Sequence, residues 1–148
     1  HEYIFLLTKS PRYFYDAEAV AEEAQPGARR FNGSPTYANG DRNDAGRRDQ
    51  SDLQWRNRRS VWTITTQPFS EAHFATFPPE LAETCIKAGC PSGGMVLDPF
   101  GGAGTTGLVA DQLGRDCTLI ELNPEYAEMA RRRIERDGGM FSQVEIAA

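Results

Sequence analysis

The sequence of 148 residues has few cysteines and histidines and no long apolar run. Its three cysteines, Cys85, Cys90 and Cys117, are an odd number without Cys-x-x-Cys spacing, which argues against a disulfide framework and a zinc site. No apolar run approaches the ~20 residues that cross a bilayer, and no signal-peptide pattern is present. We therefore predict a cytoplasmic protein with reduced thiols, no metal and no membrane partner.

What the sequence does contain is a glycine-rich turn at the end of an apolar strand pattern. Residues 96–107 are expected to form a buried strand that ends at Asp98, a turn, and the start of a helix. The glycines of such a turn permit a positive φ and let a ligand approach the main chain closely. This is where an α/β protein binds a nucleotide-like cofactor.

Two cofactors compete for this turn. Gly102-x-Gly104-x-x-Gly107 satisfies the dinucleotide fingerprint, and Glu121 follows the next apolar run as a ribose-binding carboxylate should. However, Asp98 places an anion at the mouth of the turn, which repels a pyrophosphate and attracts a cation. S-adenosylmethionine carries a sulfonium and an ammonium group and no phosphate. A phosphate-binding P-loop is disfavoured because Gly-Lys-Ser/Thr is absent.

Four segments carry a family resemblance. Residues 98–106, Asp-Pro-Phe-Gly-Gly-Ala-Gly-Thr-Thr, resemble the cofactor motif of the DNA methyltransferases that modify the exocyclic amine of adenine or cytosine. Residues 120–126 are similar to the second cofactor motif, and residues 73–81 to the segment that closes over the methionine end of the cofactor. Residues 1–10 resemble a strand near the end of the catalytic half. The resemblance implies S-adenosyl-L-methionine as cofactor and double-stranded DNA as partner.

The order of these segments is that of the β class, in which the cofactor half is C-terminal. The family's catalytic tetrapeptide, Asp, Asn or Ser followed by Pro-Pro and an aromatic residue, occurs nowhere in the 148 residues. Ser34-Pro35-Thr36-Tyr37 comes nearest, but it follows no buried strand and is typical of a turn. We therefore expect a fragment that lacks catalytic residues and is inactive alone, its catalytic half missing or on a second chain. An NAD-type module and a non-catalytic DNA-binding half of a split methyltransferase remain alternatives.

The charge of the chain is unevenly distributed. The net charge is −5, yet residues 29–59 hold eight arginines against four aspartates, a local charge of +4. This segment is poor in aliphatic residues, which predicts a long loop or a segment ordered by a partner. A solvated linker is one interpretation; DNA phosphate contacts are the other. The candidate DNA-binding residues are Arg47, Arg48, Arg56, Arg58 and Arg59.

Hydrophobic periodicity predicts an α/β fold, and the resemblance makes it a partial Rossmann-like methyltransferase fold with a mostly parallel sheet and an antiparallel hairpin at one edge. Strands are expected at 2–8, 13–15, 61–64, 95–98, 118–121 and 141–146, and helices at 16–24, 79–88, 104–113 and 124–136. Three regions follow: 1–25, the end of the catalytic half; 26–60, a candidate target-recognition region; and 61–148, the cofactor-binding region.

The resemblance also suggests individual cofactor contacts. They are Asp98, Pro99, Phe100, Gly102, Gly104, Thr105, Glu121, Asn123, His73, Phe74 and Ala75. Thr105 is expected to bind the cofactor carboxylate or cap the helix, and Asn123 to touch the adenine edge or only start the next helix. Phe100 packs on the cofactor or belongs to the core. Residues 131–133, three consecutive arginines, are expected on the solvated face of the last helix.

Overall fold

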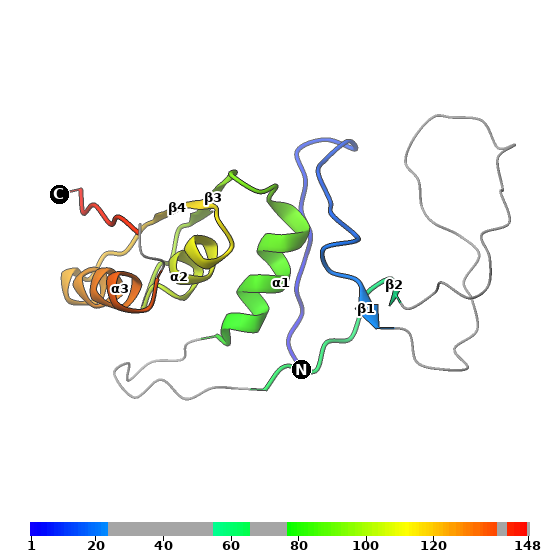
Figure 1. The fold of residues 1–148 in the computed structure, drawn as a ribbon, viewed down its shortest axis with the longest axis horizontal. Coiled ribbons are helices and arrows are strands. Elements are labelled where there is room, and N and C mark those ends of the chain that lie inside the picture. The colour runs from blue at the N-terminus through cyan, green and yellow to red at the C-terminus, as the bar shows by residue number, and fades with distance from the viewer. Residues whose placement is uncertain (24–54, 66–76, 139–141, 148) are drawn as a thin grey trace, which may run out of the picture.

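The structure is a computed structural model that describes residues 1–23, 55–65, 77–138 and 142–147. An α/β unit lies at one end of the molecule in Figure 1, and extended N-terminal chain runs beside it. The elements of the α/β unit follow one another as helix, strand, helix, strand, helix, which confirms the predicted α/β class. Among the described residues, no helix is long and apolar enough to cross a membrane.

The centre of the unit is a pair of parallel strands. β3 (Met95–Asp98) pairs with β4 (Asp116–Leu119), and the register places Asp98 opposite Leu119. α2 (Thr105–Gln112) connects the two strands and packs on β4. The N–H of Ile120 donates to the carbonyl of Asp98 at 2.9 Å, so the ladder runs one residue beyond β4. The carboxyl ends of both strands therefore meet at one edge of the sheet.

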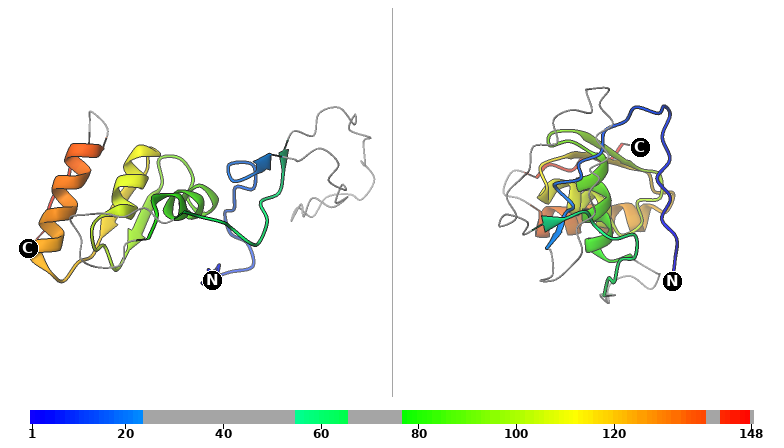
Figure 2. Two further views of the ribbon diagram at one scale, coloured as in Figure 1. Left: turned by 90° about the horizontal axis from the view of Figure 1, so that it is seen from below. Right: turned by 90° about the vertical axis from the view of Figure 1, so that its right-hand side faces the viewer.

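The three helices lie side by side with α2 in the middle (Figures 1 and 2). α1 (Pro79–Gly89) begins with a proline in its first turn, and α3 (Pro124–Asp137) begins after Asn123, whose side chain caps it. The core between α1, α2 and the strands is small and aliphatic. It consists of Ala82, Ile86, Cys90, Val109 and Ala110, with Val96, Leu113 and Cys117 packed against it.

The N-terminal part forms its own short antiparallel sheet. β1 (Glu22–Glu23) pairs with β2 (Trp55–Arg56), and this two-stranded sheet is separate from the parallel one. A hydrogen bond of 2.9 Å from the N–H of Asp16 to the carbonyl of Ala88 ties the segment to α1. The large apolar side chains between Tyr3 and Leu7 are exposed.

Several predicted strands are wrong. Residues 2–8, 13–15 and 61–64 and the described part of 141–146 are not strands, because no neighbouring strand is present among the described residues to accept their backbone hydrogen bonds. The antiparallel pair lies at β1 and β2 instead of the predicted hairpin. The helix predicted from Asp16 is only a turn, in which Asp16 accepts from the N–H of Ala19 at 2.9 Å. β4 begins two residues before the predicted strand. The helices at 79–88, 104–113 and 124–136 are confirmed to within one or two residues.

Candidate cofactor site

The candidate site is built on the glycine-rich turn that follows β3. Gly102 and Gly104 have φ values of +48° and +76°, a backbone conformation that residues other than glycine rarely adopt. The turn lies against the end of β4, since the N–H of Gly101 donates to the carbonyl of Ile120 at 2.8 Å. Among the described residues, a Cβ atom on Gly102 would have only the carbonyl oxygen of Phe100, at 3.8 Å, within 4 Å. The turn is therefore open at Gly102.

Asp98 lies at the mouth of the turn with its carboxylate fixed. Its Oδ1 accepts from the N–H of Phe100 at 2.9 Å, and its Oδ2 accepts from the hydroxyl of Thr106 at 2.6 Å. These bonds orient a negative charge at the carboxyl end of β3. The sequence did not single out Thr106, although its place in the first turn of the predicted helix is compatible with this bond.

Glu121 follows β4, and its carboxylate binds the turn on the other side from Asp98. Its Oε2 accepts from the N–H of Gly102 at 2.8 Å, and its Oε1 accepts from the N–H of Asn123 at 2.9 Å. The two bonds hold the carboxylate beside the turn, and each oxygen keeps a lone pair for a further donor. Because the parallel strands end together, Asp98 and Glu121 flank the same turn.

Apolar surface borders these carboxylates. Phe100 is 84% exposed and Leu122 is 94% exposed, and Pro99 is also exposed. Phe100 therefore does not belong to the core. A mainly apolar groove of about 470 Å³ between α1 and β3 is lined by Phe77 and Leu81 and reaches Asp98. Exposed aromatic and aliphatic groups beside fixed carboxylates suit a ligand with both an apolar ring and polar hydroxyl or cationic groups.

Two predicted contacts have structural roles. Asn123 accepts from the N–H of Glu125 at 2.9 Å and so caps α3. Thr105 is only 4% exposed, and its hydroxyl accepts from Arg133 at 3.0 Å. The N-cap of α2 is Gly104, without a side-chain cap, so Thr105 does not cap the helix. His73, Phe74 and Ala75 lie outside the described residues.

α3 packs against the back of the turn. A Cβ atom on Gly104 would lie 2.8 Å from Cβ of Ala130, so the turn and the helix are in close contact. Arg133 is buried on this same face of α3, where the sequence predicted a solvated residue. Its spacing of three residues from Ala130, next to Ile134, was the signal for the buried face.

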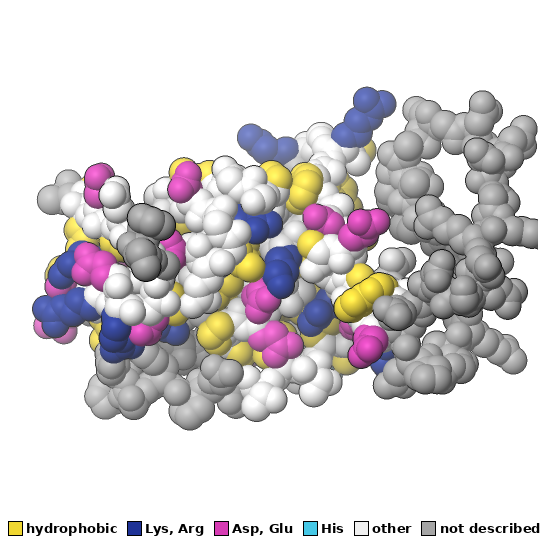
Figure 3. Space-filling view, in the orientation of Figure 1, with side chains coloured by type: hydrophobic (Ala, Val, Ile, Leu, Met, Phe, Trp, Pro, Cys, Tyr) yellow, Lys and Arg dark blue, Asp and Glu magenta, His cyan; other side chains and the backbone are white. Residues whose placement is uncertain are grey.

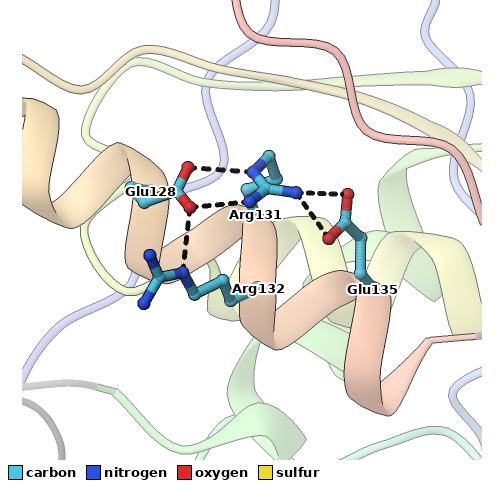
Figure 4. A network of polar contacts seen from close by, with 4 residues as sticks. All are labelled: Glu128, Arg131, Arg132 and Glu135. Atoms are coloured by element: carbon cyan, nitrogen blue, oxygen red, sulfur yellow. Dashed lines mark hydrogen bonds and ion pairs between the residues drawn. The ribbon is translucent and has the colours of Figure 1, made fainter.

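The opposite face of α3 carries an exposed network of charges (Figure 4). Glu128 accepts from Arg131 and Arg132, and Arg131 also pairs with Glu135 at 2.6 Å. Hydrogen bonds from Arg131 and Arg132 lower the pKa of Glu128 to about 2, and Glu128 and Glu135 raise the pKa of Arg131. Charges of both signs are interspersed over this end of the molecule (Figure 3). Arg132 is exposed, as predicted, whereas Arg131 is half-buried between Glu128 and Glu135.

The described candidate DNA-binding arginines make contacts within the chain. Glu22 pairs with Arg56 at 3.2 Å and with Arg59 at 3.4 Å. The pKa of Glu22 is lowered, chiefly by the hydrogen bond from the backbone N–H of Arg59. The guanidinium of Arg58 lies 5.0 Å from the ring centroid of Trp62 and 4.0 Å from Glu80. Arg47 and Arg48 lie outside the described residues.

Comparisons with known proteins place these features in context. The model of a family described as DNA methylase matches residues 1–132. The chain is 43% identical over 136 residues to the Type II methyltransferase M.SmaI of Serratia marcescens, covering 92% of this chain and 38% of that protein. It is 42% identical over 148 residues to M.XycI of Xanthomonas campestris pv. cyanopsidis, covering 100% and 40%. The chain thus spans about two fifths of the length of these relatives.

Among solved structures, PvuII DNA methyltransferase (cytosine-N4-specific) is similar to this chain. The sequence identity is 36%, the TM-score is 0.41, and the match covers 51% of this chain and 24% of the solved one. The complex of M1.HpyAVI with S-adenosylmethionine matches at 32% identity and a TM-score of 0.43, covering 48% and 36%.

Proposed function

The chain belongs to the DNA methylase family, and from this premise we propose that it carries the S-adenosylmethionine site of a site-specific DNA methyltransferase. The proposed target is the exocyclic amine of adenine or cytosine in double-stranded DNA, and the biological setting is restriction and modification. Residues 61–148 are the proposed cofactor region, 26–60 the target-recognition region, and 1–25 the end of the catalytic half.

One observation carries this proposal: Asp98 and Glu121 flank the same glycine-rich turn with their carboxylates fixed by backbone N–H groups. A fixed carboxylate at Asp98 attracts the cationic end of S-adenosylmethionine. The carboxylate of Glu121 has the geometry to accept from the two ribose hydroxyls, because its oxygens keep free lone pairs beside the open side of Gly102.

The same hydrogen bonds argue against a dinucleotide. A pyrophosphate site needs turn N–H groups that point at the ligand. Here the N–H of Phe100 donates to Asp98, that of Gly101 to Ile120, and that of Gly102 to Glu121. The N–H of Gly104 donates back to the carbonyl of Gly101 at 2.8 Å. A turn whose donors are used in this way favours a ligand without phosphate.

The apolar surfaces extend the match to the remaining parts of the cofactor. Exposed Phe100 and Leu122 lie next to the carboxylates and offer packing surfaces for the adenine ring. The groove that reaches Asp98 is lined by Phe77, which belongs to the segment expected to cover the methionine end. These residues supply binding and orientation of the methyl donor.

We propose that methyl transfer needs a second part of the enzyme. The base amine is a poor nucleophile, because its lone pair is delocalised into the ring, and acceptors on its N–H groups must activate it after the base leaves the duplex. The tetrapeptide that supplies such acceptors in the family does not occur in these 148 residues. The chain alone is expected to bind the cofactor weakly and to transfer no methyl group.

The basic segment is proposed to contact DNA phosphates. Of its described arginines, Arg59 has the most exposed side chain at 57%, against 27% for Arg56 and 21% for Arg58. Because Glu22 already pairs with Arg56 and Arg59, DNA binding has to compete with that carboxylate. Replacing Arg56, Arg58 and Arg59 together is expected to weaken DNA binding in fluorescence anisotropy, with a shallower salt dependence. Unchanged affinity would remove the proposal.

Calorimetric titration of the chain with S-adenosylmethionine and with NAD tests the cofactor. We expect binding of the first alone, and a loss of about tenfold or more in Glu121→Gln, because the amide removes the charge and places an NH₂ group against the N–H of either Gly102 or Asn123. Asp98→Asn is expected to weaken binding through the lost charge. Asp116→Asn is the matched control, since Asp116 is exposed at the other end of β4. Binding of NAD in place of S-adenosylmethionine would contradict the proposal.

A further inference from the structure

Arg133 is the unusual member of the three consecutive arginines in α3. It is 9% exposed, whereas the side chain of its neighbour Arg132 is 74% exposed. Arginine is almost never buried unless its donors are paired. Its buried neighbours on the helix are Ala130 and Ile134, which form the face of α3 that contacts the turn and α2.

One nitrogen of Arg133 binds the two residues that flank Gly104, the last glycine of the turn. Nη1 donates to the carbonyl oxygen of Ala103 at 3.1 Å and to the hydroxyl oxygen of Thr105 at 3.0 Å. Gly104 lies between these two residues with a φ of +76°, pressed against Ala130. Bonds to a charged donor are stronger than neutral ones, and these two are buried.

We propose that Arg133 is a positioning residue for the methyl-donor site, which holds the backbone of residues 103–105 so that the N–H of Gly102 points at Glu121. This inference rests on the proposed function. It deepens that function because Arg133 lies behind the turn and acts on the cofactor only through Ala103, Thr105 and Gly102. Arg133 therefore sets the orientation of Glu121 without touching the ligand.

The hydrogen-bond path makes the coupling specific. Arg133 fixes the carbonyl of Ala103, which is the residue directly after Gly102, and Gly102 donates to Oε2 of Glu121 at 2.8 Å. When Arg133 is lost, the turn keeps its glycines and its contact with Ala130 but loses both buried bonds. The expected result is a looser turn inside an otherwise intact α/β unit.

Three variants of the full chain test this proposal: Arg133→Met, Arg133→Lys and, as control, Arg132→Met. Methionine keeps the apolar stem and removes the donors. Lysine restores a donor, and one nitrogen is sufficient for the turn because the bonds of Arg133 to Ala103 and to Thr105 both come from Nη1. Arg132 pairs with Glu128 on the solvated face of the helix, away from the turn.

Two readouts are measured on each variant. Hydrogen exchange of the peptide that covers residues 101–106 is expected to rise about tenfold in Arg133→Met, to return partly in Arg133→Lys, and to stay at the wild-type rate in Arg132→Met. The Kd for S-adenosylmethionine is expected to rise about tenfold in Arg133→Met with the same rank order. Exchange in α1 reports whether the unit remains folded.

The outcomes separate this proposal from the proposed function. Wild-type exchange of residues 101–106 in a folded Arg133→Met chain would overturn it, as would unchanged cofactor affinity beside a loosened turn. If the wild-type chain binds no S-adenosylmethionine, the proposed function fails, and the exchange data alone decide whether Arg133 holds the turn. If Arg133→Met does not fold, Thr105→Val decides, because it removes one acceptor and keeps the arginine. Exchange at the wild-type rate in that variant overturns the proposal.

Discussion

The α/β unit from Pro79 to Asp137 and the N-terminal part, residues 1–23 with 55–65, are held together in different ways. In the first, helices and strands enclose a shared apolar core in which Ala110 is 0% exposed. In the second, Val20 is the one buried apolar residue among those described, and ion pairs of Glu22 join the two short strands. The contrast is that the cofactor turn rests on apolar packing behind it, whereas the described arginines of the basic segment are held by ion pairs and a cation–π contact.

The largest expected effect comes from breaking the packing behind the turn. Gly104→Ala places a methyl group 2.8 Å from Cβ of Ala130 at a φ of +76°. We expect a loss of about 2 to 4 kcal/mol in the free energy of unfolding, from the left-handed backbone and the overpacking together. Urea unfolding measures it.

Gly114→Ala is the matched control for that variant. Gly114 has a φ of +68°, but no atom of the part of the chain that the structure describes lies within 4 Å of the position that an added methyl group would take. The loss there is expected to be only about 1 to 2 kcal/mol, because the backbone alone is strained. Equal losses in both variants would show that the contact between α3 and the turn contributes nothing.

A smaller effect is expected from the side chain that holds Asp98. Thr106→Val removes a buried hydroxyl that donates to Oδ2 of Asp98 at 2.6 Å, at nearly the same volume. We expect a loss of about 1 to 2 kcal/mol in unfolding free energy, together with weaker binding of S-adenosylmethionine. Thr118→Val, on the exposed side of β4, is the control. A stability loss in the control alone would contradict this role.

The N-terminal part should respond locally. Glu22→Gln removes the charge that pairs with Arg56 and Arg59, so hydrogen exchange of residues 55–65 is expected to accelerate. The global unfolding free energy should change by less than about 1 kcal/mol, the usual range for a surface ion pair. Glu23→Gln, at the exposed neighbouring position, is the control. A large global loss would show that the two regions are not independently stabilised.

The smallest effect is expected on the solvated face of α3. The arginines there lower the pKa of Glu128 from its usual 4.5 to about 2. A lowered carboxyl pKa contributes stability that is present above pH 4.5 and is lost as the pH falls toward 2. Glu128→Gln should therefore reduce the melting temperature slightly at about pH 7, less in high salt, and progressively less as the pH falls through about 2. A reduction that persists at the acidic end would point to another cause.

The same contrast explains what the sequence could predict. The helices of the α/β unit were predicted well because their signals are local: Pro79 and Pro124 begin α1 and α3, and Gly104 precedes α2. The helix expected at 16–24 is only a turn among the described residues. The strands expected at 2–8 and 13–15 were predicted wrongly. A strand forms only beside a partner strand, and alternating apolar residues do not reveal whether a partner strand is present.

The sequence predicted the residues of the candidate site but not the hydrogen bonds that connect them. Asp98 ends β3 as predicted, whereas Glu121 lies two residues beyond the end of β4 and not at its last residue. Both still lie at the same edge, because the parallel strands end together. The burial of Arg133 was missed because its two arginine neighbours suggested a solvated stretch. The pairing of the turn N–H groups was also not predicted. It depends on how closely β4 approaches the turn, and the residue pattern does not give that distance.

Gly107 has a consequence for how this sequence can evolve. A Cβ atom there would lie 2.8 Å from Cδ1 of Ile134 and 2.9 Å from Cδ1 of Leu119. Side chains of α3 and β4 therefore both pack into the space that a side chain at position 107 would occupy. A lineage that enlarges residue 107 has to move the terminal methyl groups of Leu119 and Ile134 or to shrink one of these two residues. The sizes of these three residues are therefore expected to covary, while Gly114, which has no neighbour within 4 Å among the described residues, is constrained by its backbone conformation.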